Sequence, residues 1–551
     1  MDRIWLPSYP PGMPAEIDAD AFASVVDLFD TSVARFAALP AYTCMGRTID
    51  YATLDRLTRE LAGCFQSLGL APGARVALML PNILQHPVAL FAVLRAGCTV
   101  VNCNPLYTAR ELEYQLADSG AEAIVVLENF AGVAARALPG TRVKHVIVTG
   151  LGDMLGAFKG ALVNAVVRHV KRLVPPWRIK GAMGWREALA RGRRAGFAPV
   201  AARGADIAFL QYTGGTTGVA KGAMLTHRNI VANLQQAHAW IAGKVAEGRE
   251  TIVTALPLYH VFSLTANCLT FLKLGANNVL IPNPRDIRGF VRELAQHRFT
   301  AITGVNTLFQ ALLRNPRFRR LDFSALKISL GGGMAVQRGV AEAWRSATGA
   351  TLIEAYGLTE TSPAVTINPL DLPAFNGSIG LPLPSTEVAI RDEAGGDLPP
   401  GEAGEVCVRG PQVMAGYWNR PDETAQVMMA DGFMRTGDIG TMDAAGYVWL
   451  LDRKKDMVLV SGFNVYPNEV EAVVATHPGV LEAAAVGVPH EKSGEALKLF
   501  VVRRDPALTA EALVAHCRQS LAPYKVPHLI EFREELPKTN VGKVLRRALR
   551  E

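Results

Sequence analysis

Two hydrophobic patterns alternate along residues 51–150. Segments 53–70, 84–97 and 106–120 carry apolar residues at the spacing of about 3.6 residues that is typical of an amphipathic helix. Short runs that are apolar at nearly every position separate these segments, as in parallel strands that are covered on both faces. These runs lie at residues 75–80, 99–102, 123–127 and 144–149. The alternation therefore predicts an α/β unit with a doubly wound parallel sheet.

A second series of the same kind follows a basic interval rich in alanine and glycine, residues 186–204. Helical segments again separate apolar runs that have the length of strands. The runs lie at residues 207–213, 251–257, 277–282, 300–305 and 327–333. We therefore expect two related doubly wound sheets, one from each series, with the basic interval as the separator.

The pattern changes again after about Pro382. Short alternating strands with tight turns, at 387–392, 404–410 and 446–452, predict a small antiparallel β subdomain. Beyond Asp452 fewer than a hundred residues remain, and they mix helical and strand patterns. The sequence thus predicts a large domain over residues 1–452 and a small α+β domain at the carboxyl end.

Composition narrows the class of protein. Of the 551 residues, 49% are hydrophobic and 19% charged, which excludes a disordered chain. The 57 Lys and Arg residues exceed the 50 Asp and Glu residues by only seven, and they form no long basic blocks, which argues against nucleic acid as a partner. We also find no secretion signal and no apolar run of the roughly 18 residues that a membrane span requires. We therefore expect a cytoplasmic protein.

The seven cysteines are scattered and contain no Cys-x-x-Cys pair. An odd number in this arrangement is typical of reduced thiols in a cytosolic core, and we assign none of them a catalytic role. They are Cys44, Cys64, Cys98, Cys103, Cys268, Cys407 and Cys517.

A loop rich in glycine and threonine follows the predicted strand at 207–213. Glycines allow the main chain to approach a polyphosphate closely, while hydroxyl groups and a lysine supply hydrogen bonds and charge. The loop is not a Walker motif, because Ala220 rather than glycine precedes Lys221. The residues that we expect to bind phosphate are Thr213, Gly214, Gly215, Thr216, Thr217, Gly218 and Lys221.

This loop resembles the hallmark motif of the adenylate-forming family, which includes acyl-CoA synthetases, adenylation domains and firefly-type luciferases. Further motifs of that family follow in order: LPLYHVF at 256–262, GGGMAV at 331–336, AYGLTET at 355–361, RTGD at 435–438, DRKKDMVLVSGFNVYPNEVE at 452–471 and PKTNVGKVLRR at 537–547. The segment NPLYTARELEYQL at 104–116 and the carboxyl region are most similar to bacterial long-chain fatty-acid–CoA ligases. The resemblance covers almost the whole chain.

The resemblance implies a nucleotide site. Tyr356, expected in a loop after a strand, would offer its ring to adenine beside the backbone of Gly332, Gly333, Ala355 and Gly357. Thr359 and Glu360 would bind the α-phosphate and Mg²⁺, with Thr213 as a second metal-binding residue, and a carboxylate oxygen is a ligand that Mg²⁺ favours. Asp438 would accept the ribose hydroxyls near Arg453. Lys543 would contact the α-phosphate while the acyl-adenylate forms.

The resemblance also implies the reaction. A fatty acid would attack ATP to give an acyl-adenylate and pyrophosphate, and the thiol of coenzyme A would then displace AMP. The small domain would rotate about Lys455 between the two steps, in a hinge at residues 453–455. Gly462 would line the channel for coenzyme A. Relatives form dimers through the large domain, so a homodimer is an open prediction.

Several alternatives stay open at this stage. His260 belongs to the region that forms the acyl pocket and gates ATP in the family, but a single histidine beside aromatic residues also fits an ordinary core position. A fatty-acyl-AMP ligase or an aryl-acid–CoA ligase would use the same chemistry, although residues 452–471 lack the insertion of the former class. A non-catalytic lipid-binding protein is a third alternative, which the intact motifs oppose.

Residues 153–177 predict a basic amphipathic helix. Lys171, Arg168 and Arg172 fall on one side of it. The opposite face would carry Leu155, Phe158, Leu162, Val166, Val170 and Leu173. Such a helix fits a membrane surface or packing against the core, and both readings remain open.

Overall fold

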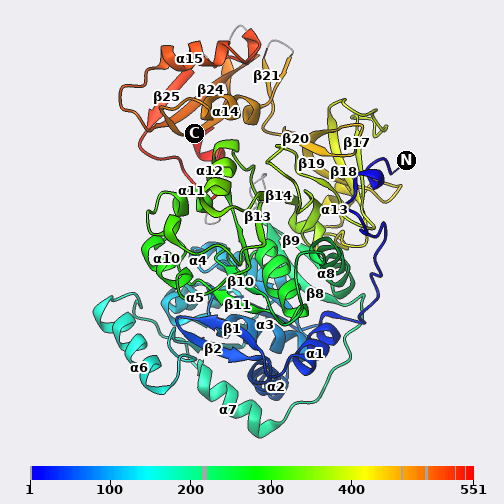
Figure 1. The fold of residues 1–551 in the computed structure, drawn as a ribbon. Helices are drawn as coiled ribbons and strands as arrows, with labels where there is room; N and C mark the ends of the chain where they lie inside the picture. Colours follow the sequence, from blue (N-terminus) through cyan, green and yellow to red (C-terminus); the bar gives the residue numbers. More distant parts are fainter. Residues whose placement is uncertain are drawn as a thin grey trace.

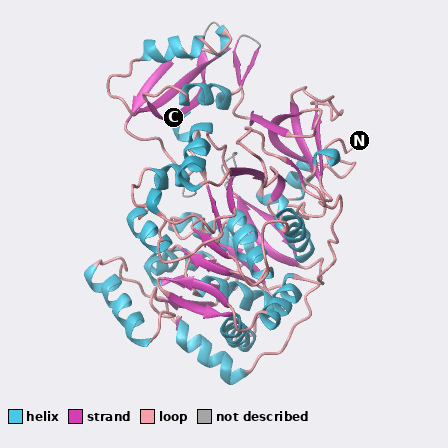
Figure 2. Ribbon diagram, in the orientation of Figure 1, coloured by secondary structure: helices cyan, strands magenta, loops and turns pink. Residues whose placement is uncertain are grey.

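The computed structural model describes residues 3–213, 220–460, 463–490, 494–527, 529–539 and 542–550. Figure 1 shows the large domain below, the small carboxyl-terminal domain at the top and the β subdomain at the upper right. In Figure 2 the strands of the large domain lie in the interior and helices surround them. The α/β class that the sequence predicts is therefore confirmed.

The first sheet is formed by seven strands in the order β7-β6-β5-β3-β4-β8-β9. All neighbouring strands are parallel except β8 and β9. Their bounds are β3 (Arg75–Met79), β4 (Thr99–Asn102), β5 (Ala123–Leu127), β6 (His145–Thr149), β7 (Met183–Gly184), β8 (Ile207–Thr213) and β9 (Lys221–Thr226). The helices interleaved with them are α2 (Tyr51–Ser67), α3 (Gln85–Arg95), α4 (Ala109–Ser119), α5 (Ala131–Ala137), α6 (Ala157–Ala165) and α7 (Trp185–Ala195).

The assignment of the basic interval 186–204 as a separator is wrong. Most of it is helix α7, which packs against α2. A Cβ atom on Gly192 of α7 would lie only 1.6 Å from the carbonyl oxygen of Glu60 in α2, so glycine allows this close helix packing. Strand β8, which we assigned to the second series, also belongs to the first sheet, where it pairs with β4.

The second sheet has nine strands in the order β16-β15-β14-β13-β12-β10-β11-β1-β2. Its centre is parallel and its edges are antiparallel. The bounds are β1 (Pro40–Cys44), β2 (Arg47–Asp50), β10 (Thr251–Thr254), β11 (Asn277–Leu280), β12 (Ala301–Gly304), β13 (Ile328–Gly332), β14 (Leu352–Gly357), β15 (Ala364–Ile367) and β16 (Leu381–Pro382). Strands β1 and β2 precede the first sheet in the sequence, which the division into two consecutive series did not foresee.

Helices α1 (Val25–Arg35), α8 (His227–Ile241), α9 (Thr270–Lys273), α10 (Ile287–Leu294), α11 (Asn306–Leu313) and α12 (Arg338–Thr348) accompany the second sheet. Helix α8 begins with a capping box in which Thr226 and Asn229 exchange side-chain and backbone hydrogen bonds. A π-helical segment, η5 (Ser263–Leu269), precedes α9. Among the described residues, shorter helical turns are η1 (Leu6–Ser8), η2 (Glu128–Phe130), η3 (Leu138–Gly140), η6 (Phe318–Arg320), η7 (Thr359–Thr361) and η8 (Pro523–Lys525).

The β subdomain is a four-stranded antiparallel sheet, as the sequence predicts. It contains β17 (Glu387–Arg391), β18 (Gly404–Arg409), β19 (Met434–Met442) and β20 (Val448–Arg453), with α13 (Pro421–Val427) beside β19. The small domain comprises β21 (Val458–Val460), β22 (Phe463–Val465), β23 (Val480–His490), β24 (Gly494–Arg503), β25 (Leu529–Arg533), α14 (Pro467–Ala475), α15 (Ala510–Arg518) and α16 (Arg547–Arg550).

All seven cysteines are buried and unpaired, which agrees with their assignment to the core. Among the described residues, no helix combines the length and the apolar composition needed to cross a membrane.

The amphipathic segment 153–177 is only partly helical. Helix α6 and the π-helical turn η4 (Val166–Val170) cover its middle. Leu155 precedes the helix and is buried in the core, so its placement on the common apolar face is wrong. Figure 1 shows α6 at the lower left edge of the molecule.

Candidate active site

One large cavity lies between the large domain, the β subdomain and the small domain. Its volume is about 2750 Å³. It brings together residues as far apart in the sequence as Asn102 and Arg550. The predicted site residues that line it are Thr213, Lys221, His260, Gly332, Gly333, Ala355, Tyr356, Gly357, Thr359, Glu360, Asp438, Arg453, Lys455 and Lys543. Gly214, Gly215, Thr216, Thr217, Gly218 and Gly462 lie outside the described residues.

Strands β13 and β14 place two backbone segments side by side at the cavity wall. Tyr356 lies within β14 and not in a loop after it, which corrects the prediction. A Cβ atom on Gly332 would lie 3.0 Å from the carbonyl oxygen of Ala355 and 3.2 Å from the Phe262 ring. Gly333 has a φ of +76°, a conformation that favours glycine. Because these glycines carry no side chain, a flat ring has room to lie against the backbone.

A buried network fixes the tyrosine. Tyr356 donates its hydroxyl to Asp438 Oδ2 at 2.6 Å, and Arg453 Nε lies 2.7 Å from Asp438 Oδ1. Asp438 lies in β19 directly opposite Arg453 in β20, so sheet register creates the ion pair. Burial raises the pKa of Asp438, although the charges of Arg453 and Lys543 oppose this effect. Both carboxylate oxygens therefore face donors next to the cavity.

Glu360, in η7, is held by a residue that the sequence did not reveal. Tyr417 donates its hydroxyl to Glu360 Oε1 at 2.8 Å. Lys221 forms an ion pair with Glu423, and its ammonium group lies 5.2 Å from the centre of the Tyr417 ring. Tyr417 lies in none of the motifs described above, so only its position in the fold connects it with the site.

The metal-binding capacity of this region is limited. Among the described residues, no group of three or more His, Cys, Asp or Glu side chains could hold a metal ion. Glu360 and the Thr213 hydroxyl line the same cavity. One carboxylate with few protein ligands fits Mg²⁺ that is bound together with substrate phosphates, because Mg²⁺ keeps most of its other ligands as water or phosphate oxygen.

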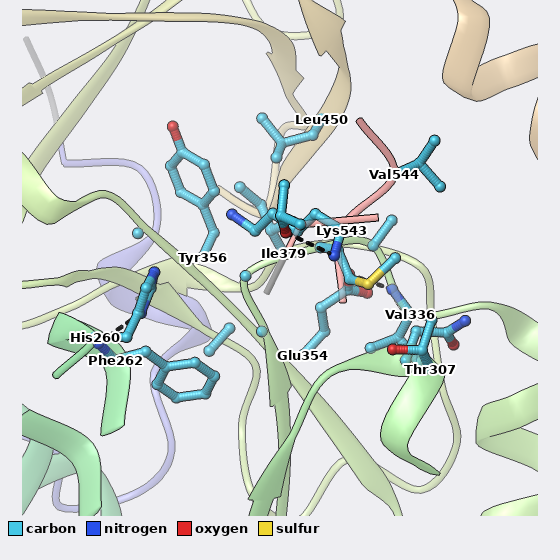
Figure 3. Close-up of a pocket in the computed structure, with 18 of the residues that line it drawn as sticks. His260, Phe262, Thr307, Val336, Glu354, Tyr356, Ile379, Leu450, Lys543 and Val544 are labelled. Atoms are coloured by element: carbon cyan, nitrogen blue, oxygen red, sulfur yellow. Dashed lines mark hydrogen bonds between the residues drawn. The ribbon is translucent and has the colours of Figure 1, made fainter. Parts of the chain in front are cut away.

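Lys543 enters the cavity from the small domain. Its Cε would lie 3.8 Å from a Cβ on Gly333, which places Lys543 at the cavity wall beside Gly332 and Gly333. Burial, with help from the positive charge of Arg453, lowers the pKa of Lys543 to about 8. Burial also lowers the pKa of His260 to about 4, and the charge of Lys543 adds to that effect. Figure 3 shows Lys543, Tyr356 and His260 around the same space, although they come from different elements.

Glu354 is a second residue of the cavity that sequence reasoning missed. It lies two positions before Tyr356 in β14, and its Oε1 accepts a hydrogen bond from the backbone N–H of Val336 at 2.9 Å. Burial raises the pKa of Glu354 to about 8, so the carboxyl group is largely protonated at neutral pH. An acidic residue inside the apolar run LIEAY was the signal that could have revealed it.

The lining of the cavity includes residues of helix α8 and of the second sheet, and we call this part of the cavity the apolar branch. Asn233, Ala237 and Ile241 line it at intervals of four, on one face of α8. Ile328, Leu330 and Gly332 line it at alternate positions of β13. The distance along the helix from Asn233 to Ile241 and the distance along the strand from Ile328 to Gly332 are both about 12–13 Å. The remaining lining of this branch includes Ile252, Ala266, Thr270, Phe271, Ala301, Thr303 and Ile367.

Comparison with known proteins identifies the family. The family described as AMP-binding enzyme matches residues 29–418, and the AMP-binding enzyme C-terminal domain matches residues 469–543. The chain belongs to the AMP-binding enzyme family. This AMP-binding enzyme is 57% identical over 552 aligned residues to a long-chain-fatty-acid–CoA ligase of Yersinia pestis, covering 100% of this chain and 98% of the relative.

Two further comparisons agree with this result. A long-chain-fatty-acid–CoA ligase of Haemophilus influenzae is 53% identical to this AMP-binding enzyme, with 100% of this chain and 98% of the relative covered. The crystal structure of ATP-bound MatB from Rhodopseudomonas palustris has a TM-score of 0.81 at 29% identity, covering 95% of this chain and 98% of that chain. The similarity thus extends over both domains and over nearly the full length.

Proposed function

We propose that this AMP-binding enzyme is an ATP-dependent long-chain fatty-acid–CoA ligase. The observation that carries the proposal is the continuity of one cavity, which contains both the predicted nucleotide residues and the apolar branch along α8. Its relatives at 53–57% identity carry the name long-chain-fatty-acid–CoA ligase over their whole length. A site that places an apolar chain beside a nucleotide fits the activation of fatty acids.

We assign the first half-reaction to the residues around Tyr356. The adenine lies between the Tyr356 ring and the backbone at Gly332, and Asp438 accepts the ribose hydroxyls. A carboxylate oxygen of the fatty acid attacks the α-phosphorus, the bond to pyrophosphate breaks, and an acyl-adenylate forms. Lys543 supplies a positive charge where negative charge accumulates on the α-phosphate, which lowers the barrier. No protein nucleophile is needed, in agreement with seven buried cysteines.

Glu360 and Thr213 are the residues that we propose as the protein ligands of Mg²⁺. When bound, Mg²⁺ would neutralise charge on the ATP phosphates. The hydrogen bond from Tyr417 fixes the Glu360 side chain and leaves its second oxygen for this role. Glu360 is thereby oriented toward the cavity before substrate arrives.

We assign the second half-reaction to a different placement of the small domain. The sulfur of coenzyme A attacks the acyl carbonyl carbon, the carbonyl–phosphate bond breaks, and AMP leaves with the thioester as product. The proposed hinge, residues 453–455, connects β20 to the small domain, and its last residue, Lys455, is exposed. An exposed residue is free to change its backbone angles without disturbing a packed core.

The Lys543→Ala variant tests the assignment of Lys543 to the first half-reaction. Pyrophosphate release with acids from acetate to oleate first establishes the substrate class of the unmodified enzyme. The variant is then compared in two assays, palmitate with ATP and synthetic palmitoyl-AMP with coenzyme A. We expect about 10²- to 10³-fold slower adenylation and nearly unchanged thioester formation. Equal loss in both assays would contradict the role of Lys543, and a maximum at acetate or benzoate would contradict the fatty-acid assignment.

We further propose that the segment 153–177 contacts an anionic membrane surface. Its large apolar side chains are exposed to solvent: Phe158 by 86%, Val170 by 74%, Leu162 by 56% and Leu173 by 53%. Residues 153–177 contain four Lys or Arg residues and one acidic residue, a net charge of +3. Apolar groups beside basic groups complement a bilayer with anionic lipids.

A vesicle sedimentation assay tests the membrane proposal. Binding is measured with phosphatidylcholine vesicles, with and without phosphatidylglycerol. The double variant Phe158→Ser, Leu162→Ser should bind the anionic vesicles at least about ten-fold more weakly. Leu529→Ser, which removes an exposed apolar side chain of the small domain, is the matched control. Equal binding by both variants would refute the proposal.

Dimerisation through the large domain stays a prediction, which sedimentation equilibrium can test.

A further inference from the structure

We propose that Arg546 is a positioning residue, which holds the Lys543 segment against the large domain through the buried carboxylate of Asp452. The proposal rests on the proposed function, because it concerns the step that Lys543 serves. Arg546 and Asp452 belong to an ionic cluster beside the proposed hinge, which also contains Asp456, Glu471 and Arg550.

The carboxyl-terminal segment returns from the small domain to the cavity. Its turn is closed by a hydrogen bond from the Leu545 N–H to the Pro537 carbonyl at 2.8 Å. A Cβ on Gly542 would lie 2.8 Å from Thr307 Oγ1, so the segment touches the large domain one residue before Lys543. Arg546 follows Lys543 by three residues, and the placement of the Lys543 ammonium group is therefore coupled to that of Arg546.

Asp452 presents a buried carboxylate at the end of β20, on the large-domain side of the proposed hinge. Its side chain has no exposed surface. Oδ1 accepts from the N–H of Arg453 at 2.7 Å, and Oδ2 accepts from the N–H of Asn468 at 2.8 Å. The Arg546 guanidinium lies 3.6 Å from Oδ1. A buried carboxylate requires such compensation, so the small domain supplies both a hydrogen bond and a positive charge to it.

The other partners of Arg546 belong to the small domain or the segment that leads into it. Its Nη2 donates to Asn468 Oδ1 at 2.5 Å and to Glu471 Oε1 at 2.8 Å, and Nη1 lies 3.6 Å from Asp456 Oδ2. Arg550 pairs with Asp456 at 2.8 Å, and in the part of the chain that the structure describes it forms no ion pair with the large domain. Arg546 therefore joins carboxylates on both sides of the hinge, whereas Arg550 joins groups on one side only.

The consequence is specific for one half-reaction. Without the Arg546 charge, Asp452 would remain buried with less compensation, and the arrangement that brings Lys543 to Gly333 would be less populated. Adenylation requires that arrangement under the proposed mechanism. Thioester formation from a preformed acyl-adenylate does not use Lys543, so it should not depend on the Asp452–Arg546 pair.

The test compares Arg546→Gln, Asp452→Asn and the double variant, with Arg550→Gln as the matched control. Adenylation is measured with palmitate and ATP, and thioester formation with synthetic palmitoyl-AMP and coenzyme A. We expect each single variant to slow adenylation about 10- to 100-fold, the double variant to be no slower than the worse single variant, and thioester formation to change less than about two-fold. Arg546→Lys should restore part of the adenylation rate.

Three results would overturn the proposal: equal loss of both half-reactions in the Arg546 and Asp452 variants, equal effects of Arg546→Gln and Arg550→Gln, or no change in adenylation. Thermal unfolding of each variant identifies a loss of fold, and a variant that forms thioester at the normal rate is necessarily folded. Failure of the proposed function would look different, because the unmodified enzyme would then form no acyl-CoA from fatty acid, ATP and coenzyme A.

Discussion

Replacing Ala237 with phenylalanine should shorten the apolar branch of the cavity and shift the enzyme toward shorter acids. Ala237 lies midway between Asn233 and Ile241 on the face of α8 that lines the branch. The helix rises about 6 Å between Ala237 and Ile241. An extended chain advances about 1.2 Å per bond, so about five methylenes would lose their place. At about 0.8 kcal/mol for each buried methylene, the loss is about 4 kcal/mol.

This free energy corresponds to a decrease of about a thousand-fold in kcat/KM for palmitate. Hexanoate, which would end before the new ring, should keep its kcat/KM within a few-fold. The assay is pyrophosphate release over a series of even-numbered acids. Ala239→Phe is the control, because Ala239 lies two residues farther along α8 and does not line the cavity. If Ala237→Phe lowered kcat/KM for hexanoate and palmitate equally, or if Ala239→Phe had the same effect, the proposed course of the acyl chain would be wrong.

Three further predictions concern individual residues. Glu360→Ala should slow adenylation at least about 100-fold, which rate measurements would reveal. It should lower the free energy of unfolding, measured by urea titration, by only about 1 kcal/mol through the lost Tyr417 hydrogen bond. Unchanged activity would remove Glu360 from the site. Lys455→Pro should preserve adenylation and abolish thioester formation, because proline fixes φ near about −65°; equal loss in both assays would contradict the hinge. The pKa of Glu354 is raised to about 8, so near neutral pH the folded enzyme holds a proton on Glu354 that the unfolded chain releases. The contribution of Glu354 to the stability of the fold is therefore complete below the usual glutamate pKa and is lost as the pH rises through about 8. Unfolding free energies measured between pH 5 and pH 9 should therefore fall less for Glu354→Gln than for the unmodified enzyme, and parallel curves would refute this.

The sequence predicted most of the local structure of the first series. Helices α2, α3 and α4 and strands β3 to β6 agree with the predicted segments to within a few residues, because the side-chain period of a segment directly reflects which of its faces are buried. It was not sufficient for the order of the strands. Strand β8 joins the first sheet, and the hairpin β1–β2 crosses to the second. Pairing between distant strands depends on which edges meet in space, and a local period carries no information about that.

In the active site, too, the sequence predicted individual residues but not the contacts between them. The motifs predicted Tyr356, Asp438 and Lys543, because nucleotide chemistry restricts these positions to few residue types and the motifs keep their order. The sequence could not show that Tyr356 and Asp438 are hydrogen-bonded across 82 positions. Tyr417 and Asp452 meet Glu360 and Arg546 only through tertiary contacts of the same kind.

The charge states of the site were decided by the tertiary structure alone. Glu354 and Lys543 are an ordinary acid and an ordinary base in the sequence, and both have pKa values of about 8 in the folded enzyme. Their shifts come mainly from desolvation, which depends on the surrounding atoms that the fold brings together and not on neighbours in the chain. The sequence thus determined which chemical groups are available, and the fold determined their distances and their protonation.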